Sequence, residues 1–273
     1  MASPECCSNP PTLNPSSGTG HVETLGGLDS YVTGSLDSNL AVLLISDVFG
    51  FEAPNLRKLA DKVAAAGFFV VVPDFLNKDP YAPEDANRPV SVWIKDHGPD
   101  KGFEDAKPVL EALKSKGVSA IGAAGFCWGA KVVVELSKHA LIQAAVLCHP
   151  SLVTVDDIKG KIPVLIFRKY LHHYWNKKLV SHSLYDLFLD LLSEVKVPIS
   201  ILGAEIDRMS PPEVVRQFEE VLTTKPEVKS HVKIFPKVSH GWTVRYSVED
   251  EAACKSAEEA HQDLLKWFLN HVK

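Results

Sequence analysis

One short stretch of the sequence combines a nucleophilic side chain with a distinctive spacing of glycines. Residues 125–129 read Gly-Phe-Cys-Trp-Gly, with Cys127 at the centre. The apolar run VSAIGAA precedes them and AKVVVELSK follows, so a strand should end and a helix begin here. Glycines allow the tight turn, and a helix N-terminus stabilises a thiolate. This is the context of a nucleophile elbow with Cys in place of Ser, and the pattern predicts an attacking thiolate. The alternative is a small buried thiol.

Two residues further along the chain could complete this chemistry. A cysteine nucleophile needs a general base and a group that orients the base. Asp207 ends the run ISILGAEID, and His240 follows VKIFPKVS. In parallel sheets ligands bind at the carboxyl ends of the strands, where both residues are expected. Two alternatives stay open at Asp207: it could cap the helix that follows, or Glu205 could take its place. His240 could be an ordinary loop histidine.

The elements that must position these residues alternate between strand-like and helix-like patterns. Strands are expected at 21–34 (a hairpin turning at Gly26-Gly27), 40–46, 68–75, 118–125, 142–150, 197–207 and 231–236. Helices are expected at 53–67, 103–117 (with Pro108 in the first turn), 129–139, 211–222 and 249–272. Such alternation predicts an α/β fold, a doubly wound and mostly parallel sheet with helices on both faces. We expect a flexible tail at 1–19 and a single domain at 20–273.

Composition narrows the classes of function. The net charge is −5, and the sequence has no basic stripe, so a nucleic-acid partner is not expected. No long apolar run indicates a membrane span, and the N-terminus does not resemble a secretory signal. Five cysteines without a disulfide framework suit a reducing compartment, so a cytoplasmic location is expected. Cys6 and Cys7 could be acylated or bind metal, but a plain disordered tail is favoured.

One segment interrupts the alternation. Residues 160–195 make the connection between two expected strands far longer than usual. Its start, KIPVLIF, resembles KVPISIL from Lys196 onward. One interpretation is a lid or an added helical pair. The favoured one is an insertion from splicing or from a gene model, since removing 161–195 restores a compact connection. Transcript reads across the join would decide between them.

The motifs together resemble one known family. ISDVFGF, FFVVVPDF, GFCWGAK, LGAEIDRMSPP and HGW lie between about residues 40 and 245. They resemble the dienelactone hydrolase (carboxymethylenebutenolidase) family of the α/β-hydrolase fold, and they look most similar to cytosolic plant members, some named as glucanases. The resemblance implies a catalytic triad of Cys127, Asp207 and His240. It also implies an acidic residue that contacts and activates the nucleophile. The matching position is Asp47, where the best-known members carry Glu, and the alternative is a carboxylate that caps the following loop.

The resemblance also implies a reaction. His240 would take the thiol proton, and Asp207 would fix the imidazole tautomer. The thiolate would attack a small-molecule ester or lactone and form a thioester, which water then hydrolyses. The backbone N–H groups of Trp128 and Val48 would hold the oxyanion. No cofactor or metal is expected, and the chain is expected to be a monomer or a weak dimer.

Substrate recognition and the class of function leave alternatives open. Arg245 and Trp242 are weak candidates for substrate binding, and Arg88 and Arg208 compete with Arg245. Instead of an enzyme, the chain could be a non-catalytic binding module of the same fold. A glucan hydrolase would need two facing carboxylates, and Asp47 and Asp207 could be offered, but Asp207 is better explained as the partner of His240. A thiol redox protein is disfavoured because the sequence has no C-x-x-C.

Overall fold

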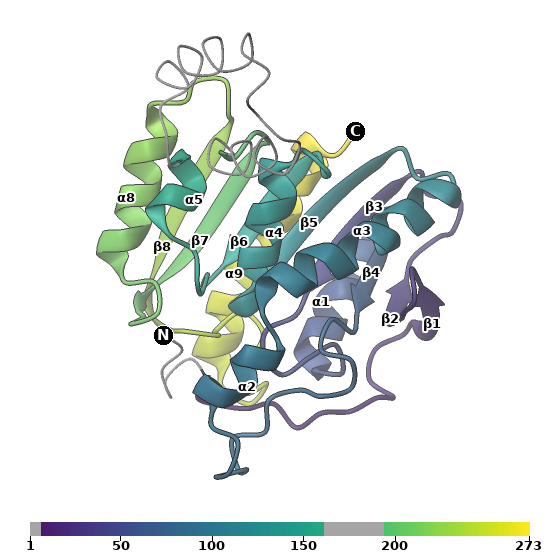
Figure 1. Ribbon diagram of the computed structural model, residues 1–273, viewed down its shortest axis with the longest axis horizontal. Coiled ribbons are helices and arrows are strands. Elements are labelled where there is room, and N and C mark those ends of the chain that lie inside the picture. Colours follow the sequence, from purple (N-terminus) through teal and green to yellow (C-terminus); the bar gives the residue numbers. More distant parts are fainter. Residues whose placement is uncertain (1–6, 161–193) are drawn as a thin grey trace, which may run out of the picture.

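The fold is built on a twisted central sheet (Figure 1). The computed structural model of the 273-residue chain describes residues 7–160 and 194–273. Within these residues eight strands lie in the order β1-β2-β4-β3-β5-β6-β7-β8. The pairs β1–β2 and β2–β4 are antiparallel, and all other neighbours are parallel. The strands are β1 (His21–Leu25), β2 (Leu28–Thr33), β3 (Leu40–Ile45), β4 (Phe69–Pro73), β5 (Ala120–Phe126), β6 (Ala144–Cys148), β7 (Ile199–Ile206) and β8 (Ser230–Ser239).

Helices cover both faces of the sheet (Figure 1). Helices α3, α4, α5 and α8 bury apolar side chains in the core on one face, and α1 and α9 bury theirs on the other. The strands between them are apolar runs because both of their faces are covered. The helices are α1 (Pro54–Ala65), α2 (Val90–Asp96), α3 (Pro99–Ser115), α4 (Trp128–Lys138), α5 (Val155–Lys159), α8 (Pro212–Thr223) and α9 (Glu251–His271). The expected doubly wound architecture is confirmed.

Some expected elements differ from the structure. Pro108 was expected in the first turn of its helix, but α3 begins at Pro99, so Pro108 lies in the helix interior. A proline at the first position favours that earlier start. The turn of the β1–β2 hairpin packs closely on the helix there, since a Cβ added at Gly26 would lie 2.4 Å from Val109 N. Helices α2 and α5 were not expected, and β8 is longer than its predicted strand.

The N-terminal residues pack against the body from Cys7 onward, where a flexible tail was expected. The buried Arg57 donates through Nη1 to the carbonyl oxygens of Pro15 (2.6 Å) and Ser17 (3.3 Å). Arg245 donates to the carbonyl of Ser8 at 3.1 Å. These partners lie far away in the sequence, so the Pro- and Ser-rich composition did not reveal them. Residues 1–6, including Cys6, lie outside the described residues.

Most of the expected insertion also lies outside the described residues, which stop at Gly160 and resume at Glu194. Lys225 connects the two flanks, because its Nζ donates to the carbonyl of Lys159 at 3.3 Å and pairs with the carboxylate of Glu194. Val195 is buried in the core. The returning chain is therefore part of the packed fold from Glu194 onward.

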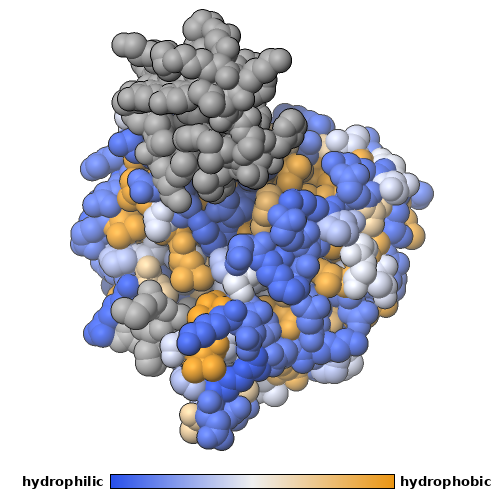
Figure 2. All heavy atoms as spheres, in the orientation of Figure 1, coloured by the Kyte–Doolittle hydropathy of each residue, from blue (hydrophilic) through white to orange (hydrophobic). Residues whose placement is uncertain are grey.

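The surface face in Figure 2 is mostly hydrophilic, with separate hydrophobic patches. Large apolar side chains that are exposed, among the described residues, belong to different elements and loops: Val22, Leu36, Val92, Ile206, Val248 and Leu269. No described helix is long and apolar enough to cross a membrane.

Candidate active site

Cys127 lies in a strained turn between β5 and α4. It is the N-cap of α4 with φ 53° and ψ −110°, a conformation that L-residues rarely adopt. The surrounding backbone holds it there: Cys127 N–H donates to Cys148 O (3.1 Å), and Cys127 O accepts from Ser151 N–H (3.0 Å). The side chain is fully buried at 0% exposure. Strain of this kind, held in place by neighbouring strands, is characteristic of a nucleophile elbow.

The two glycines of the pentapeptide make this turn possible. A Cβ at Gly125 would lie 2.3 Å from Gly129 O, and a Cβ at Gly129 would lie 2.3 Å from Ile45 O. Both clashes are with backbone atoms, which cannot rotate away. The missing side chains thus let the start of α4 lie directly against the end of β3.

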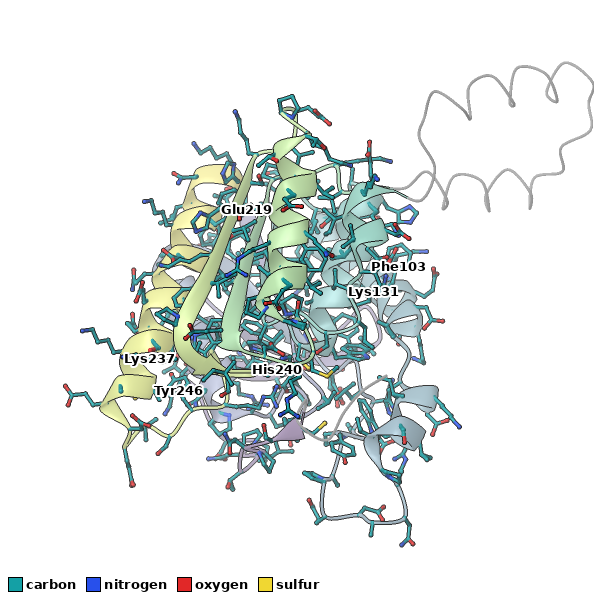
Figure 3. The ribbon with its side chains drawn as sticks, turned by 90° about the vertical axis from the view of Figure 1, so that its left-hand side faces the viewer. Phe103, Lys131, Glu219, Lys237, His240 and Tyr246 are labelled. Carbon is teal, nitrogen blue, oxygen red and sulfur yellow. The ribbon has the colours of Figure 1, made fainter. Side chains whose placement is uncertain are left out.

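His240 and Asp207 come together at the same edge of the sheet. His240 directly follows β8 and lies at the lower end of that strand in Figure 3. Its Nδ1 lies 2.7 Å from Asp207 Oδ2. The other carboxylate oxygen of Asp207 accepts from the N–H groups of Met209 (2.7 Å) and Ser210 (3.2 Å). Because a carboxylate only accepts, the proton on Nδ1 points to Asp207 and Nε2 faces away from it.

A third side chain contacts both the thiol and the imidazole. Ser151 Oγ lies 3.3 Å from Cys127 Sγ and 3.4 Å from His240 Nε2. Burial lowers the pKa of His240, but the charge and hydrogen bond of Cys127, together with those of Asp207, raise it to about 9. An imidazolium beside a thiolate is the charge state that these contacts favour.

Asp47 and Arg245 form a buried ion pair close to this edge. Asp47 Oδ2 lies 3.0 Å from Arg245 Nε, and both side chains are almost completely buried. The approach is close but not aligned as a hydrogen bond. Asp47 Oδ1 accepts from Phe49 N–H at 2.9 Å. Asp47 thus caps its own loop, as the alternative interpretation had it, and also balances a guanidinium.

Two backbone N–H groups could serve an oxyanion. Trp128 is the first residue of α4, so its N–H has no partner within the helix. Val48 follows Asp47 in the loop after β3, and its carbonyl is occupied by Tyr81 N–H at 2.8 Å. The close packing of Gly129 on the end of β3 brings the start of α4, with Trp128, close to the loop that carries Val48.

Comparison with known proteins identifies the family. The model of the dienelactone hydrolase family matches residues 28–272, which is most of the chain. The chain belongs to this family.

The dienelactone hydrolase family assignment agrees with individual relatives. An endo-1,3;1,4-beta-D-glucanase of Zea mays is 40% identical over 232 residues, which are 84% of this chain and 64% of that protein. The chain thus spans less than two thirds of the maize protein. A carboxymethylenebutenolidase homologue of Mus musculus is 28% identical over 260 residues, 93% of this chain and 92% of the other. A putative dienelactone hydrolase of Klebsiella pneumoniae has the same fold, with a TM-score of 0.63 at 18% identity over 89% of this chain and 93% of the other. The α/β-hydrolase fold is confirmed, and the family and fold together support a hydrolase.

Trp242 and Arg245, the weak candidates for substrate binding in this dienelactone hydrolase family member, lie beside the sheet edge that carries Asp207 and His240. His240, Trp242 and Arg245 line one groove of about 1090 Å³, together with Asn9–Thr12 of the N-terminal segment. The Trp242 ring packs against the rings of Phe235 (5.3 Å between centroids) and His149 (5.4 Å). Arg88, one competitor, instead pairs with Asp79 and Asp96 at the surface. Arg208 follows Asp207 in the loop after β7.

Sequence reasoning missed two residues of this site, His149 and Ser151, which both follow β6. His149 is fully buried, its Nε2 lies 2.8 Å from Thr243 Oγ1, and its ring meets that of His240 edge-on at 5.0 Å. Burial, together with the charges of His240 and Arg245, holds the pKa of His149 well below its usual range, so its ring is neutral. For His149 the signal was present, because it is a polar residue directly after a buried strand, the same argument that found Asp207. Among the described residues, no three His, Cys, Asp or Glu side chains are grouped so as to hold a metal ion.

Proposed function

We propose that this protein hydrolyses a small-molecule ester or lactone through a Cys127–His240–Asp207 triad and a thioester intermediate. One observation carries the proposal. The strained elbow holds Cys127 in hydrogen-bonding contact with the imidazole of His240, whose far nitrogen lies 2.7 Å from a buried carboxylate. Nucleophile, base and orienting acid are thus arranged as acyl transfer requires.

In the resting enzyme the proton resides on His240. The thiolate of Cys127 and the carboxylate of Asp207 together raise the pKa of this imidazole to about 9, against the effect of burial. The nucleophile is then charged before the substrate arrives. A thiolate at the N-terminus of α4 also gains from the helix dipole.

The reaction follows from this charge state. The thiolate attacks the carbonyl carbon, and the N–H groups of Trp128 and Val48 stabilise the oxyanion. His240 protonates the leaving alkoxide and the thioester forms. His240 then takes a proton from water, the hydroxide attacks the thioester, and the acid leaves as the thiolate is restored. Thiolates leave readily, so esters and lactones are better substrates than amides.

The proposal gives Asp47 and Arg245 a supporting role. The Arg245 side chain is only 1% exposed and is engaged by Asp47 and by the Ser8 carbonyl. We therefore assign it to balancing the charge of Asp47, and Trp242 to packing behind His240. Direct activation of the thiol by Asp47 stays a prediction.

The name of the maize relative favours a second candidate, a β-glucan hydrolase. Glycoside hydrolysis needs one protonated and one ionised carboxyl group across the scissile bond. Asp207 is committed to His240, and Asp47 faces Arg245. This geometry suits acyl transfer better. Release of sugars from a mixed-linkage β-glucan that persists after thiol alkylation would support the second candidate instead.

Hydrolysis of p-nitrophenyl acetate tests the proposal. The full chain should hydrolyse it, and Cys127→Ala should abolish the activity. Cys254→Ala is the matched control, because this thiol lies on α9 and is partly exposed. Mass spectrometry of a rapidly quenched reaction should find the acetyl group on Cys127. Full activity in Cys127→Ala would overturn the proposed nucleophile. No hydrolysis by a folded wild-type chain would overturn the proposal and favour a binding module.

A further inference from the structure

Ser151 is built into the nucleophile elbow by its backbone. It lies three residues beyond the end of β6, and its N–H donates to the carbonyl of Cys127 at 3.0 Å. Its side chain is buried, with 2% of the residue exposed. The position of the hydroxyl is therefore fixed relative to the strained residue itself.

The hydroxyl contacts both reacting atoms of the proposed triad. Its oxygen lies 3.3 Å from Cys127 Sγ and 3.4 Å from His240 Nε2. These two atoms, Sγ and Nε2, are the ones that exchange the proton in the proposed mechanism, because His240 Nδ1 already binds Asp207. Ser151 thus forms the third corner of a triangle with the thiol and the imidazole.

The proton inventory of this triangle assigns a direction to each hydrogen bond. In the ion-paired state the thiolate can only accept, and Nε2 of the imidazolium can only donate. A serine hydroxyl has one proton and two lone pairs, so it can donate to Sγ, and its oxygen can share the Nε2–H proton that also hydrogen-bonds to Cys127. Both bonds involve a charged partner and are stronger than neutral ones. If Cys127 were a neutral thiol and His240 a neutral imidazole, the same hydroxyl would form only the weaker hydrogen bonds between neutral groups.

We propose that Ser151 is a further catalytic residue: its hydroxyl donates a hydrogen bond to the Cys127 thiolate and keeps Sγ directed at His240. The effect of Ser151 on catalysis rests on the proposed function. The stabilisation of the Cys127 thiolate by Ser151 does not, because it concerns only the charge state of Cys127.

Other titratable groups at this edge of the sheet also act on the thiolate. Asp207 raises the pKa of His240, and His149 stays neutral behind it. The Asp47–Arg245 pair contributes charges of both signs from the loops after β3 and β8. These groups are the same in the wild-type chain and in the Ser151 variants. Their contribution to the pKa of Cys127 therefore cancels when the alkylation midpoints are compared.

The test is the rate of alkylation by iodoacetamide against pH, read at the Cys127 peptide by mass spectrometry. In Ser151→Ala the midpoint should move upward by roughly one pH unit, and alkylation on the acidic side should slow about tenfold. Ser200→Ala is the matched control, because Ser200 is equally buried but lies within β7. It should leave the midpoint unchanged. Ser151→Gly removes the same hydroxyl and serves if the alanine variant does not fold.

The outcomes separate this proposal from the proposed function. A folded hydroxyl-free variant with the wild-type midpoint would overturn the role of Ser151, even if its ester hydrolysis fell, because packing alone would explain that fall. A shifted midpoint supports the role. It would still do so if the wild-type chain hydrolysed no ester, a result that counts against the proposed function alone.

Discussion

Replacing Asp207 by asparagine should reverse the tautomer of His240. The carboxylate accepts three hydrogen bonds: one from His240 Nδ1 at 2.7 Å, and two on its other oxygen from the N–H groups of Met209 and Ser210. An amide in this place keeps its oxygen toward the two backbone donors, because an NH₂ group there would oppose them. Its NH₂ then faces Nδ1 and donates to it. The neutral ring must carry its proton on Nε2, the nitrogen that should accept the thiol proton.

The size of the expected fall in kcat has two causes: Nε2 of His240 can no longer act as the base, and the negative charge of Asp207 is lost. In a serine triad the same exchange lowers kcat about 10⁴-fold through the wrong tautomer, which corresponds to about 5 kcal/mol. The negative charge and hydrogen bond of Asp207 are also among the causes that raise the pKa of His240. Removing them favours the neutral thiol. We expect kcat for p-nitrophenyl acetate to fall by about 10³ to 10⁴ in Asp207→Asn.

A matched control separates catalysis from folding. Asp74 is also buried and also follows a strand, β4, and it accepts from the N–H groups of Leu76 (3.2 Å) and Lys78 (2.7 Å). Asp74→Asn should keep most of the activity. Both variants should retain the wild-type circular dichroism spectrum. An Asp207→Asn enzyme with more than a tenth of wild-type kcat would refute the reasoning, as would an equal loss in Asp74→Asn.

Two further predictions concern pH and the inserted segment. Hydrolysis of phenyl acetate should decline above about pH 9, where His240 loses the proton that its raised pKa retains, and a decline already complete near neutral pH would contradict this charge state. Deleting residues 161–193 should preserve folding and activity, because Lys225 already joins the two flanks. Deleting 161–195 should give a less stable protein by about 1.5 kcal/mol or more, since buried Val195 is lost too. Urea unfolding of both deletions tests this, and a shorter deletion that fails to fold would show that the segment is integral.

The strands and the proximity of Asp207 and His240 were predictable because each depends on local patterns. Apolar runs such as 40–46 are covered on both faces, so their composition alone indicates a strand. Parallel strands place their carboxyl ends at one edge, so polar residues directly after two such runs had to be near Cys127. The geometry at Asp207 and His240 agrees with that reasoning.

The features that were missed depend on contacts between distant residues. Helix α2 lies in a stretch whose sequence pattern predicts a loop, because only Val90 and Trp93 of its residues are buried, too few for a periodic pattern. Pro108 lies inside α3, although a proline is usually found only in the first turn of a helix, and its backbone packs against the hairpin turn at Gly26. Ser151 became visible only when the loop after β6 was placed against the elbow, since no spacing in the sequence relates position 151 to position 240.

The buried charges around Cys127 explain which of its two neighbouring histidines can carry an additional proton. Asp207 pairs with His240 and Asp47 with Arg245, so two negative charges and two positive ones are matched. A further positive charge on His149 would be buried beside both cations, and its pKa is lowered accordingly. His149 therefore stays neutral and supports the ring of His240 by edge-on packing. The thiolate of the proposed mechanism adds one more negative charge to this buried site, and a hydroxyl can stabilise it without adding another charge. Ser151 supplies that hydroxyl at 3.3 Å.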